Sequence, residues 1–306
     1  MISSEDVREE LAQIAHIRRC DRLAELSALF HAAGSLHLRG KGEWAIHLDL
    51  GSGAAARRAF ALLRDEGLRS EIRTYQRRAF DRGTRYQLHL DGDDRALDVL
   101  ASAGVLDGRH APLERAPRRV VARACCRAGY LRGAFLGGGT LSIRRSAHLE
   151  LRTATREAAL VLQEVAADAG IGLGLVERPT HHAAYAKAWD DVESVLALTG
   201  AAEAVLALEE RVVLAATREQ ANRMANADHA NLVRTTKAAR AQLEAVELLR
   251  VERRLEELPI ELREAADLRL RHPAESLREL AQRTDPPASK AAMQRRLRRL
   301  EDIARG

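Results

Sequence analysis

The side chains best suited to bind another molecule gather near the C-terminus, where basic and polar residues recur within a short segment. The candidate DNA-contacting residues are Ser276, Thr284, Ser289, Lys290, Ala292, Met293, Gln294, Arg295, Arg296, Arg298 and Arg299. Lysine and arginine neutralise phosphates, and arginine and glutamine form hydrogen bonds with base edges in the major groove. The pattern predicts a surface for double-stranded DNA. The alternative is a solvated basic helix in an arginine-rich chain.

Two short helices are expected to position these side chains. Ser276, followed three residues later by Glu279, is the capping-box pattern that begins a helix. A turn over Thr284–Ala288 follows, and Ser289 is placed to cap a basic helix over Lys290–Ile303. The apolar positions expected to face inward are Ala292, Met293, Leu297 and Leu300. A short helix, a tight turn and a basic amphipathic helix are typical of a helix-turn-helix, whose second helix enters the major groove.

Signals for metal, nucleotide or redox chemistry are weaker. Cys20 and the adjacent Cys125–Cys126 have neither the number of a disulfide framework nor the spacing of a zinc site, so we expect a structural role. His181–His182 fit a solvated turn after a proline better than a metal site. Gly137–Gly139 lack the Gly-Lys-Ser/Thr of a phosphate loop and fit a helix end. We expect no metal and no cofactor.

The composition agrees with a globular protein that binds a polyanion. Of the 306 residues, 46% are apolar and 30% charged, which is ordinary for a folded domain. The net charge of +5 suits nucleic acid, although a GC-rich genome also favours arginine. Met1–Leu11 reads as a capped helix rather than a signal peptide, and no apolar run reaches the length of a membrane span. We therefore expect a cytoplasmic, nucleoid-associated protein without a membrane partner.

The first 216 residues contain an internal repeat. Each copy has a helix of small and apolar residues, a strand, an amphipathic helix closed by glycine, two strands and a helix that begins with paired acids. In the first copy these are Leu23–Leu36, Trp44–Leu50, Ala54–Glu66, Leu68–Tyr75, Arg85–Leu90 and Ala96–Ala103. In the second they are Gly129–Leu141, His148–Arg152, Arg156–Ala169, Leu173–Glu177, Ala183–Trp189 and Glu193–Leu198. The duplication predicts a pseudo-two-fold α+β domain.

The opening helices of the two copies carry small residues four apart. Ala28 and Ala32 occupy the first helix, and Gly133 and Gly137 the second, a spacing that lets helix backbones approach closely. The segments Leu26-Ser-Ala-Leu-Phe-His-Ala-Ala-Gly34 and Leu131-Arg-Gly-Ala-Phe-Leu-Gly-Gly-Gly139 resemble the LAGLIDADG homing-endonuclease fold, in which two such helices pack at the pseudo-dyad.

This resemblance also bears on catalysis. In active nucleases of the fold, the eighth motif position is an acid that holds the divalent metal, and here those degenerate positions are Ala33 and Gly138. Neither side chain can bind a metal, so the resemblance implies a fold without its nuclease chemistry. The nearby acids Glu43, Asp49 and Glu150 are expected on strands, where metal catalysis by them is disfavoured.

Whether the duplicated domain contacts DNA is left open by the sequence. Basic residues lie on or between the strands of both copies; they are Arg69, Arg73, Arg77, Arg78, Arg82 and Arg85 in the first, with Arg178 and Lys187 in the second. In nucleases of the fold the saddle-shaped sheets carry the DNA contacts. A solvated basic surface is slightly favoured, and a protein-binding or ligand-sensing role is equally compatible.

From Ala216 onward the strand pattern disappears. Arg218–Glu257 predicts one or two helices, and a further helix begins near Pro259 and stops at His272–Pro273. The predicted domains are the N-terminal helix with the first repeat (1–120), the second repeat (121–216), a helical linker (217–257) and an all-α helix-turn-helix domain (258–306).

The polar run Asn222-Arg-Met-Ala-Asn-Ala-Asp-His-Ala-Asn-Leu-Val-Arg-Thr235 resembles the linker of the WhiA family of bacterial regulators. Leu131–Gly139 and the segment from Leu268 to Leu280 also resemble this family. The linker run departs from the family at Ala227, where the family usually has cysteine, and at Arg234, where it usually has lysine. We expect the asparagines to serve as helix caps and interhelical hydrogen-bonding groups rather than as DNA contacts.

The resemblance implies a transcription regulator acting in cell division, chromosome segregation and sporulation. Its partners would be double-stranded DNA and either another transcription factor or RNA polymerase. Two alternatives stay open from the residues alone. One is a metal-dependent LAGLIDADG-type endonuclease, and the other is a scaffold whose duplicated domain binds a protein or small ligand.

Overall fold

The computed structural model describes residues 2–15, 18–38, 44–76, 83–143 and 146–306. The chain divides into two compact units, Met1–Val213 and Leu214–Gly306. Among the described residues, no helix has the length and apolar character needed to cross a bilayer.

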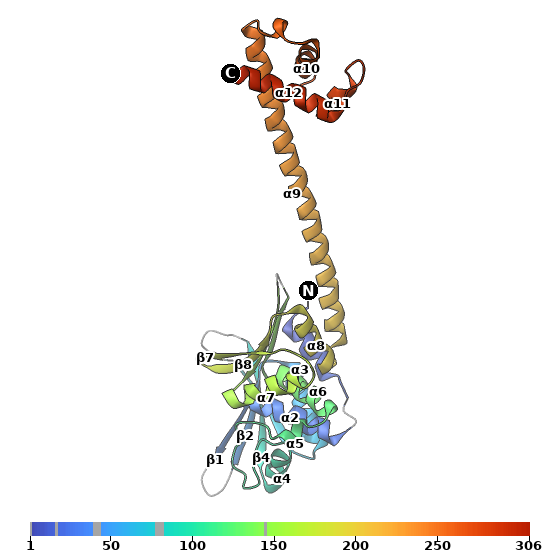
Figure 1. Ribbon diagram of the computed structural model, residues 1–306. Coiled ribbons are helices and arrows are strands. Elements are labelled where there is room, and N and C mark those ends of the chain that lie inside the picture. The colour runs from blue at the N-terminus through green and yellow to red at the C-terminus, as the bar shows by residue number, and fades with distance from the viewer. Residues whose placement is uncertain (1, 16–17, 39–43, 77–82, 144–145) are drawn as a thin grey trace. The chain divides into compact units, whose positions relative to one another are not determined.

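The first unit is built from two repeats with the same order of elements (Figure 1). Helix α1 (Ser4–Ala12) precedes them. The first repeat comprises α2 (Arg19–Ala33), β1 (Gly34–Leu38), β2 (Trp44–Leu50), α3 (Gly53–Asp65), β3 (Ser70–Gln76), β4 (Thr84–Gly92) and α4 (Asp94–Ser102). Helix α5 (Arg118–Val121) connects it to the second, which comprises α6 (Ala124–Gly138), β5 (Gly139–Ile143), β6 (Ala147–Thr153), α7 (Arg156–Ala167), β7 (Gly174–Arg178), β8 (His181–Ala186) and α8 (Trp189–Thr199).

Each repeat forms a four-stranded antiparallel sheet. The strand orders are β1-β2-β4-β3 and β5-β6-β8-β7, so the two sheets have the same topology. This confirms the predicted α+β duplication but corrects its strand count, because β1 and β5 were expected as the ends of the motif helices. Gly34 and Gly139 follow those helices directly in extended conformation (φ −83° and −73°). Leu36 and Leu141 continue the apolar pattern, so the sequence showed no break between helix and strand.

The two motif helices α2 and α6 pack against each other at the centre of this unit. A methyl group added at Gly133 would lie 2.2 Å from the carbonyl oxygen of Glu25, and one at Gly137 would lie 2.8 Å from Cβ of Ala32. Real side chains do not tolerate such distances, so glycine is required for the approach of the backbones. The expected docking of the repeats through small residues is confirmed.

A buried ion cluster joins the same helices to α3. Glu25 on α2 is fully buried, and it accepts hydrogen bonds from Arg58 (Nε–Oε1, 2.7 Å) and Arg132 (Nη1–Oε2, 3.4 Å). Burial lowers the pKa of Arg132, and the carboxylate of Glu25 opposes this shift. A buried carboxylate held between guanidinium groups specifies how α2, α3 and α6 meet.

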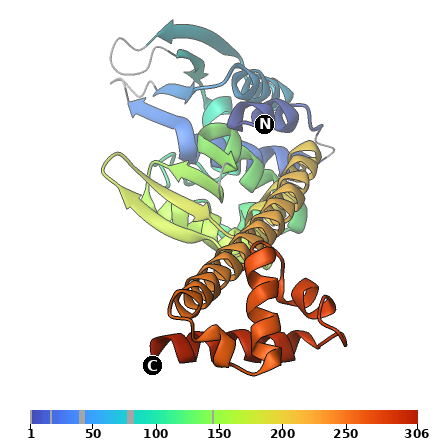
Figure 2. The ribbon, with the colours of Figure 1, turned by 90° about the horizontal axis from the view of Figure 1, so that it is seen from above.

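The long helix α9 (Ala202–Val251) leads into the second unit. It is followed by the 3-10 turn η1 (Leu255–Glu257), α10 (Ile260–Arg271), α11 (Leu277–Gln282) and α12 (Lys290–Arg305). The end of α9 lies beside these helices (Figure 2). A separate apolar core joins them, and its fully buried members are Val246, Leu249, Ala265, Leu280, Met293, Leu297 and Leu300.

The observed α9 differs from the expectation of one or two helices starting at Arg218. It begins soon after Gly200, which ends α8 with a left-handed backbone (φ +93°). The polar run Asn222–Thr235 lies inside α9 and is exposed, so the prediction that its asparagines cap helix ends is wrong. Its described side-chain contacts include one within the helix, between Arg234 Nη2 and Asn231 Oδ1 (2.5 Å).

Candidate nucleic-acid interface

The helix-turn-helix of the second unit is formed by α11 and α12. Ser276 caps α11 through the full capping box with Glu279, and Ser289 caps α12 by accepting a hydrogen bond from the backbone N–H of Ala292 (3.1 Å). His272 ends α10, as the His-Pro pair predicted. These caps fix where each short helix begins, and thereby which side chains α12 presents to solvent.

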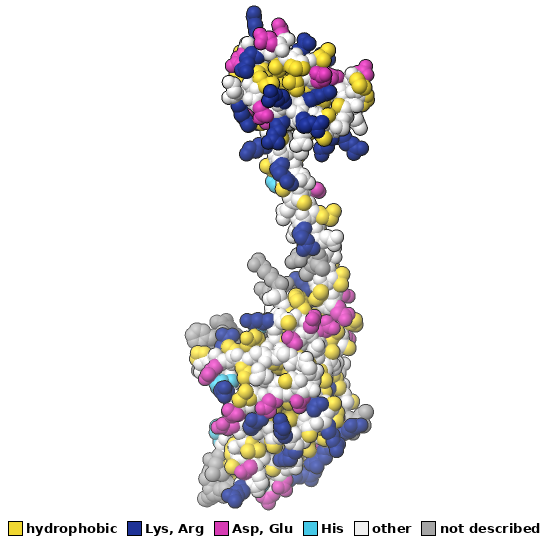
Figure 3. Space-filling model, viewed as in Figure 1, with side chains coloured by type: hydrophobic (Ala, Val, Ile, Leu, Met, Phe, Trp, Pro, Cys, Tyr) yellow, Lys and Arg dark blue, Asp and Glu magenta, His cyan; other side chains and the backbone are white. Residues whose placement is uncertain are grey.

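One face of α12 is buried and the opposite face is basic. Met293, Leu297 and Leu300 have no exposed surface and pack into the core. The exposed side chains of the helix and its cap among the candidates are Ser289, Lys290, Gln294, Arg295, Arg298 and Arg299. Within the described part of the chain, the four cations of this group form no ion pair, so their charge is available to an anion. The space-filling view shows lysine and arginine side chains gathered over this unit (Figure 3).

Several candidate residues lie where they cannot contact DNA directly. Met293 belongs to the core, and Thr284 is buried in the turn, where its hydroxyl donates to the carbonyl of Ala281 (2.9 Å) and accepts from the N–H of Ala288 (2.8 Å). The prediction that these two residues contact DNA directly is therefore wrong, because their burial shows a structural role. Ala292 is half-buried. Arg296, also half-buried, pairs with Glu264 on α10 (3.6 Å).

The two degenerate nuclease positions lie at the ends of their motif helices. Ala33 is the last residue of α2 and Gly138 the last of α6, and both line one hollow of the first unit together with Asp49, Arg85 and Arg152. A Cβ at Gly138 would lie 2.8 Å from the backbone carbonyl oxygen of Arg152. The end of α6 is therefore packed against β6, with no room for a side chain at that position.

The two acids near this hollow are bound to basic residues. Asp49 on β2 accepts a hydrogen bond from Arg85 (3.1 Å) and another from the hydroxyl of Tyr75. Glu150 on β6 accepts from Arg152 (3.0 Å) and lies 3.4 Å from His181. Both carboxylates thus have cationic or hydrogen-bonding partners within the protein.

The pKa of Glu150 records this environment. Burial tends to raise it, but the hydrogen bond and charge of Arg152, with hydrogen bonds from His181 and His148, lower the pKa below its ordinary value. The carboxylate stays ionised and neutralised by its neighbours. The third acid considered from the sequence, Glu43, lies outside the described residues.

The basic residues on the strands of the first repeat differ in their ion pairing. Arg69 and Arg73 are exposed, and Arg73 pairs with Glu71 (3.0 Å). Arg85 pairs with Asp49, whereas Arg77, Arg78 and Arg82 lie outside the described residues.

His181 and His182 begin strand β8, so the expectation of a solvated turn is wrong. β8 pairs with β6, which brings His181 to Glu150.

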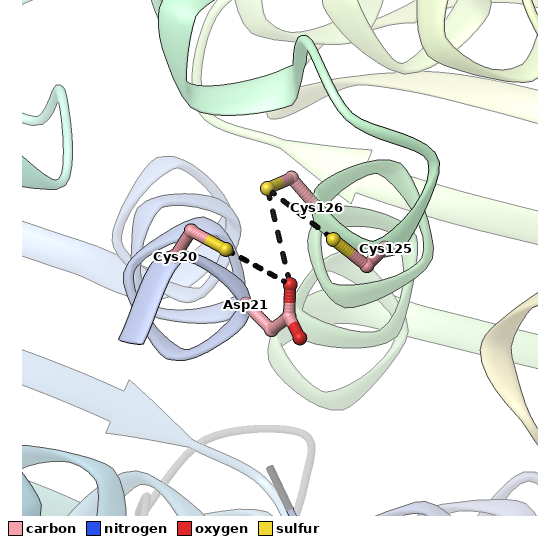
Figure 4. Close-up of side chains that lie close together, drawn as sticks. All are labelled: Cys20, Asp21, Cys125 and Cys126. Atoms are coloured by element: carbon pink, nitrogen blue, oxygen red, sulfur yellow. Dashed lines mark hydrogen bonds between the residues drawn. The ribbon is translucent and has the colours of Figure 1, made fainter. Parts of the chain in front are cut away.

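One cluster was missed because its members are far apart in the sequence. Cys20 and Asp21 at the start of α2 meet Cys125 and Cys126 at the start of α6, with the four side chains turned toward one another (Figure 4). Burial, together with the Cys20 and Cys125 thiols, raises the pKa of Cys126 to about 12. Only the duplication, which predicts that α2 and α6 pack side by side, could have brought these residues together in a sequence argument.

The arrangement defines a class of protein that joins two LAGLIDADG-like repeats to a C-terminal helix-turn-helix. Three family descriptions match in this order: the WhiA N-terminal LAGLIDADG-like domain (residues 19–106), the WhiA LAGLIDADG-like domain (127–218) and the WhiA C-terminal HTH domain (221–304). The chain belongs to the WhiA family.

Relatives and solved structures agree over the full length. A protein of Heliobacterium modesticaldum named probable cell division protein WhiA is 35% identical, covering 99% of this chain and 96% of its own. One of Symbiobacterium thermophilum with the same name is 34% identical, covering 97% of this chain and 96% of its own. The full-length WhiA structure from Thermotoga maritima is similar with a TM-score of 0.60 at 24% identity, covering 98% and 97% of the chains. This similarity shows a shared fold.

Proposed function

We propose that this chain is a sequence-specific regulator of transcription that reads double-stranded DNA with α12. The observation that carries the proposal is the exposed basic face of this helix, set opposite its buried apolar face. A capped helix with cations on one side fits the major groove, with Lys290 and Gln294 toward base edges and Arg298 and Arg299 toward phosphates. Ser289 and the helix N-terminus add backbone N–H groups for a phosphate.

Cell division is the process in which we place this regulation. The support is the printed name of the full-length relatives, probable cell division protein WhiA, together with the helix-turn-helix match. Chromosome segregation and sporulation, a nucleoid location, and contact with another transcription factor or RNA polymerase extend the same proposal. We place the domain boundaries near residues 120, 216 and 257.

We further propose that the repeats do not cleave DNA. Both degenerate positions lack a ligand atom, and the neighbouring acids Asp49 and Glu150 are held by arginines. Hard divalent ions need several free oxygen ligands, and this hollow offers carboxylates that are already neutralised. The repeats then serve to position or regulate the reader.

Genome-wide crosslinking of the protein to DNA tests the proposal, because it yields a binding motif and the associated genes together. We expect enrichment at a shared motif upstream of cell-division genes. Uniform coverage without a motif would contradict sequence-specific binding. Purified protein is then incubated with an enriched fragment and Mg²⁺ or Mn²⁺. Intact DNA is expected, and cut product at stoichiometric protein would establish the nuclease instead.

A further inference from the structure

The cysteine cluster at the start of the motif helices has the composition of a metal site. Its ligand atoms are three thiol sulfurs and one carboxylate oxygen, from Cys20, Asp21, Cys125 and Cys126, and they all lie within 4.8 Å of one another. These are the only cysteines of the chain, and the structure brings all of them to one place. Thiolates select soft or borderline metals such as zinc.

Three of the ligand–ligand distances approach those of a tetrahedral site. Zinc–sulfur bonds of about 2.3 Å place two sulfurs about 3.8 Å apart, and a sulfur and an oxygen about 3.5 Å apart. In the structure Cys125 Sγ lies 4.0 Å from Cys126 Sγ, and Asp21 Oδ1 lies 3.4 Å from Cys20 Sγ and 3.9 Å from Cys126 Sγ. Shifts of a few tenths of an ångström would bring these pairs to zinc geometry.

The surroundings suit a site of negative charge. Three thiolates and a carboxylate around a divalent ion leave a net negative charge, which the N-termini of α2 and α6 both favour. Neither helix is capped by a side chain of its N-cap residue, Arg18 or Arg123. The guanidinium of Arg18 lies 3.8 Å from Cys125 Sγ, adding a cation beside the ligands. Cys20 and Cys125 are half-buried, so an ion can enter from solvent.

A disulfide explains the cluster less well. Cys125 and Cys126 are adjacent, and consecutive Cα atoms are about 3.8 Å apart, below the usual disulfide range. A bond from Cys20 to either one would leave the third thiol outside the bridge. A common ion, in contrast, can be ligated by all three thiols and the carboxylate together.

We propose that Cys20, Asp21, Cys125 and Cys126 bind one divalent metal ion of the zinc type, in tetrahedral coordination. The ligands come two from each repeat, so the ion ties the N-terminal ends of α2 and α6 together across the pseudo-dyad. Metal binding then contributes to the folding of the first unit. This role is independent of DNA binding by α12.

Metal content and cobalt spectroscopy test the site in the full-length chain. Protein prepared with reductant is loaded with Zn²⁺, freed of excess ion and analysed for metal; about one zinc per chain is expected. Loading with Co²⁺ should give the intense thiolate-to-cobalt absorption and the visible bands of a tetrahedral site. Retention of no zinc, or cobalt spectra without sulfur ligation, would overturn the proposal.

Variants separate ligation from folding. Cys125→Ser should lose stoichiometric zinc and the cobalt–sulfur band, and Asp21→Asn should weaken zinc binding. The matched control is His181→Ala, which removes the histidine beside Glu150 and should bind zinc like the wild type. Unchanged zinc binding in Cys125→Ser, or unchanged affinity in Asp21→Asn, would contradict the assigned ligands.

Thermal unfolding supplies a readout that does not depend on spectroscopy. Zinc should raise the melting temperature of the first unit by about 5 °C in the wild type and leave that of Cys125→Ser unchanged. The metal-free forms should melt together, because serine replaces cysteine with little change in volume. A wild-type melting temperature that zinc does not move would count against the site.

Discussion

Cationic side chains occur in both units of this chain, but their surroundings differ. In the hollow between the degenerate nuclease positions, Arg85 and Arg152 bind the carboxylates of Asp49 and Glu150. On α12, Lys290, Arg295, Arg298 and Arg299 are exposed, and no described acid pairs with them. A paired arginine holds a fold together, whereas an exposed row of cations can release counterions and bind a polyanion. The arginines of the first region thus stabilise its fold, whereas those of α12 are the cations that we propose bind DNA.

The largest expected effect comes from disrupting the apolar core that holds α12 and its basic face in place. Leu297→Ala removes a fully buried side chain from the second unit's core and should destabilise that unit by about 3 kcal/mol. Hydrogen exchange measured by mass spectrometry should show faster exchange in residues 258–306 and unchanged exchange in α2 and α6. Equal acceleration in both units would show that their stabilities are coupled.

Removing cations from each region tests whether α12 or the repeats bind DNA. The double variant Arg295→Ala/Arg298→Ala should weaken binding to an enriched fragment by about 100-fold and flatten its salt dependence. Arg271→Ala, which removes an exposed arginine of α10 paired with Asp267, is the surface control. Fluorescence anisotropy across a range of salt concentrations measures both quantities. A larger loss of DNA affinity in Arg85→Ala/Arg152→Ala would show that the repeats make the main DNA contact.

Placing acids at the two degenerate positions tests how tightly the ends of α2 and α6 are packed. Gly138→Asp should cost about 2 kcal/mol, because its Cβ would lie 2.8 Å from the carbonyl oxygen of Arg152. Ala33→Asp is the matched comparison, since Ala33 already carries a Cβ and is half-buried. Chemical denaturation gives the two free energies of unfolding. Equal stability of the two variants would mean that the end of α6 is loosely packed.

Local sequence signals predicted the second unit better than the first. The caps at Ser276 and Ser289, the break at His272 and the apolar face of α12 depend on neighbouring residues, and the structure has all of them. Strands β1 and β5 were missed because Gly34 and Gly139 change the backbone direction without a turn signal.

Features that depend on tertiary contacts were harder to predict. Asp21 and Cys126 meet only because α2 and α6, which lie about a hundred residues apart in the sequence, pack together. The spacing between the cysteines carries no record of such proximity, and only the duplication could have related them. In the same way, His181 lies beside Glu150 because β6 pairs with β8.

The smallest expected effect is a pH dependence confined to the first unit. His31 is buried, with Nδ1 2.8 Å from the carbonyl oxygen of Ser27 and Nε2 3.2 Å from that of Leu113. Burial lowers its pKa, and the two carbonyl contacts only partly offset this shift. The unfolded chain then takes up a proton at a pH where the folded one does not. Stability from this group is complete above the unfolded pKa of about 6.5 and is lost as the pH falls from there toward the folded value.

Urea unfolding between pH 8 and pH 5, followed in α2 by hydrogen exchange, should show this decline in the wild type. His31→Gln keeps a side chain that can donate to a carbonyl but has no titrating ring, so its decline over the same interval should be shallower. His37→Gln is the matched control, because it makes the same substitution at an exposed histidine of the same unit. A His31→Gln profile parallel to the wild type would assign the decline to other groups, and a decline of equal size in the second unit would remove the contrast between the two regions.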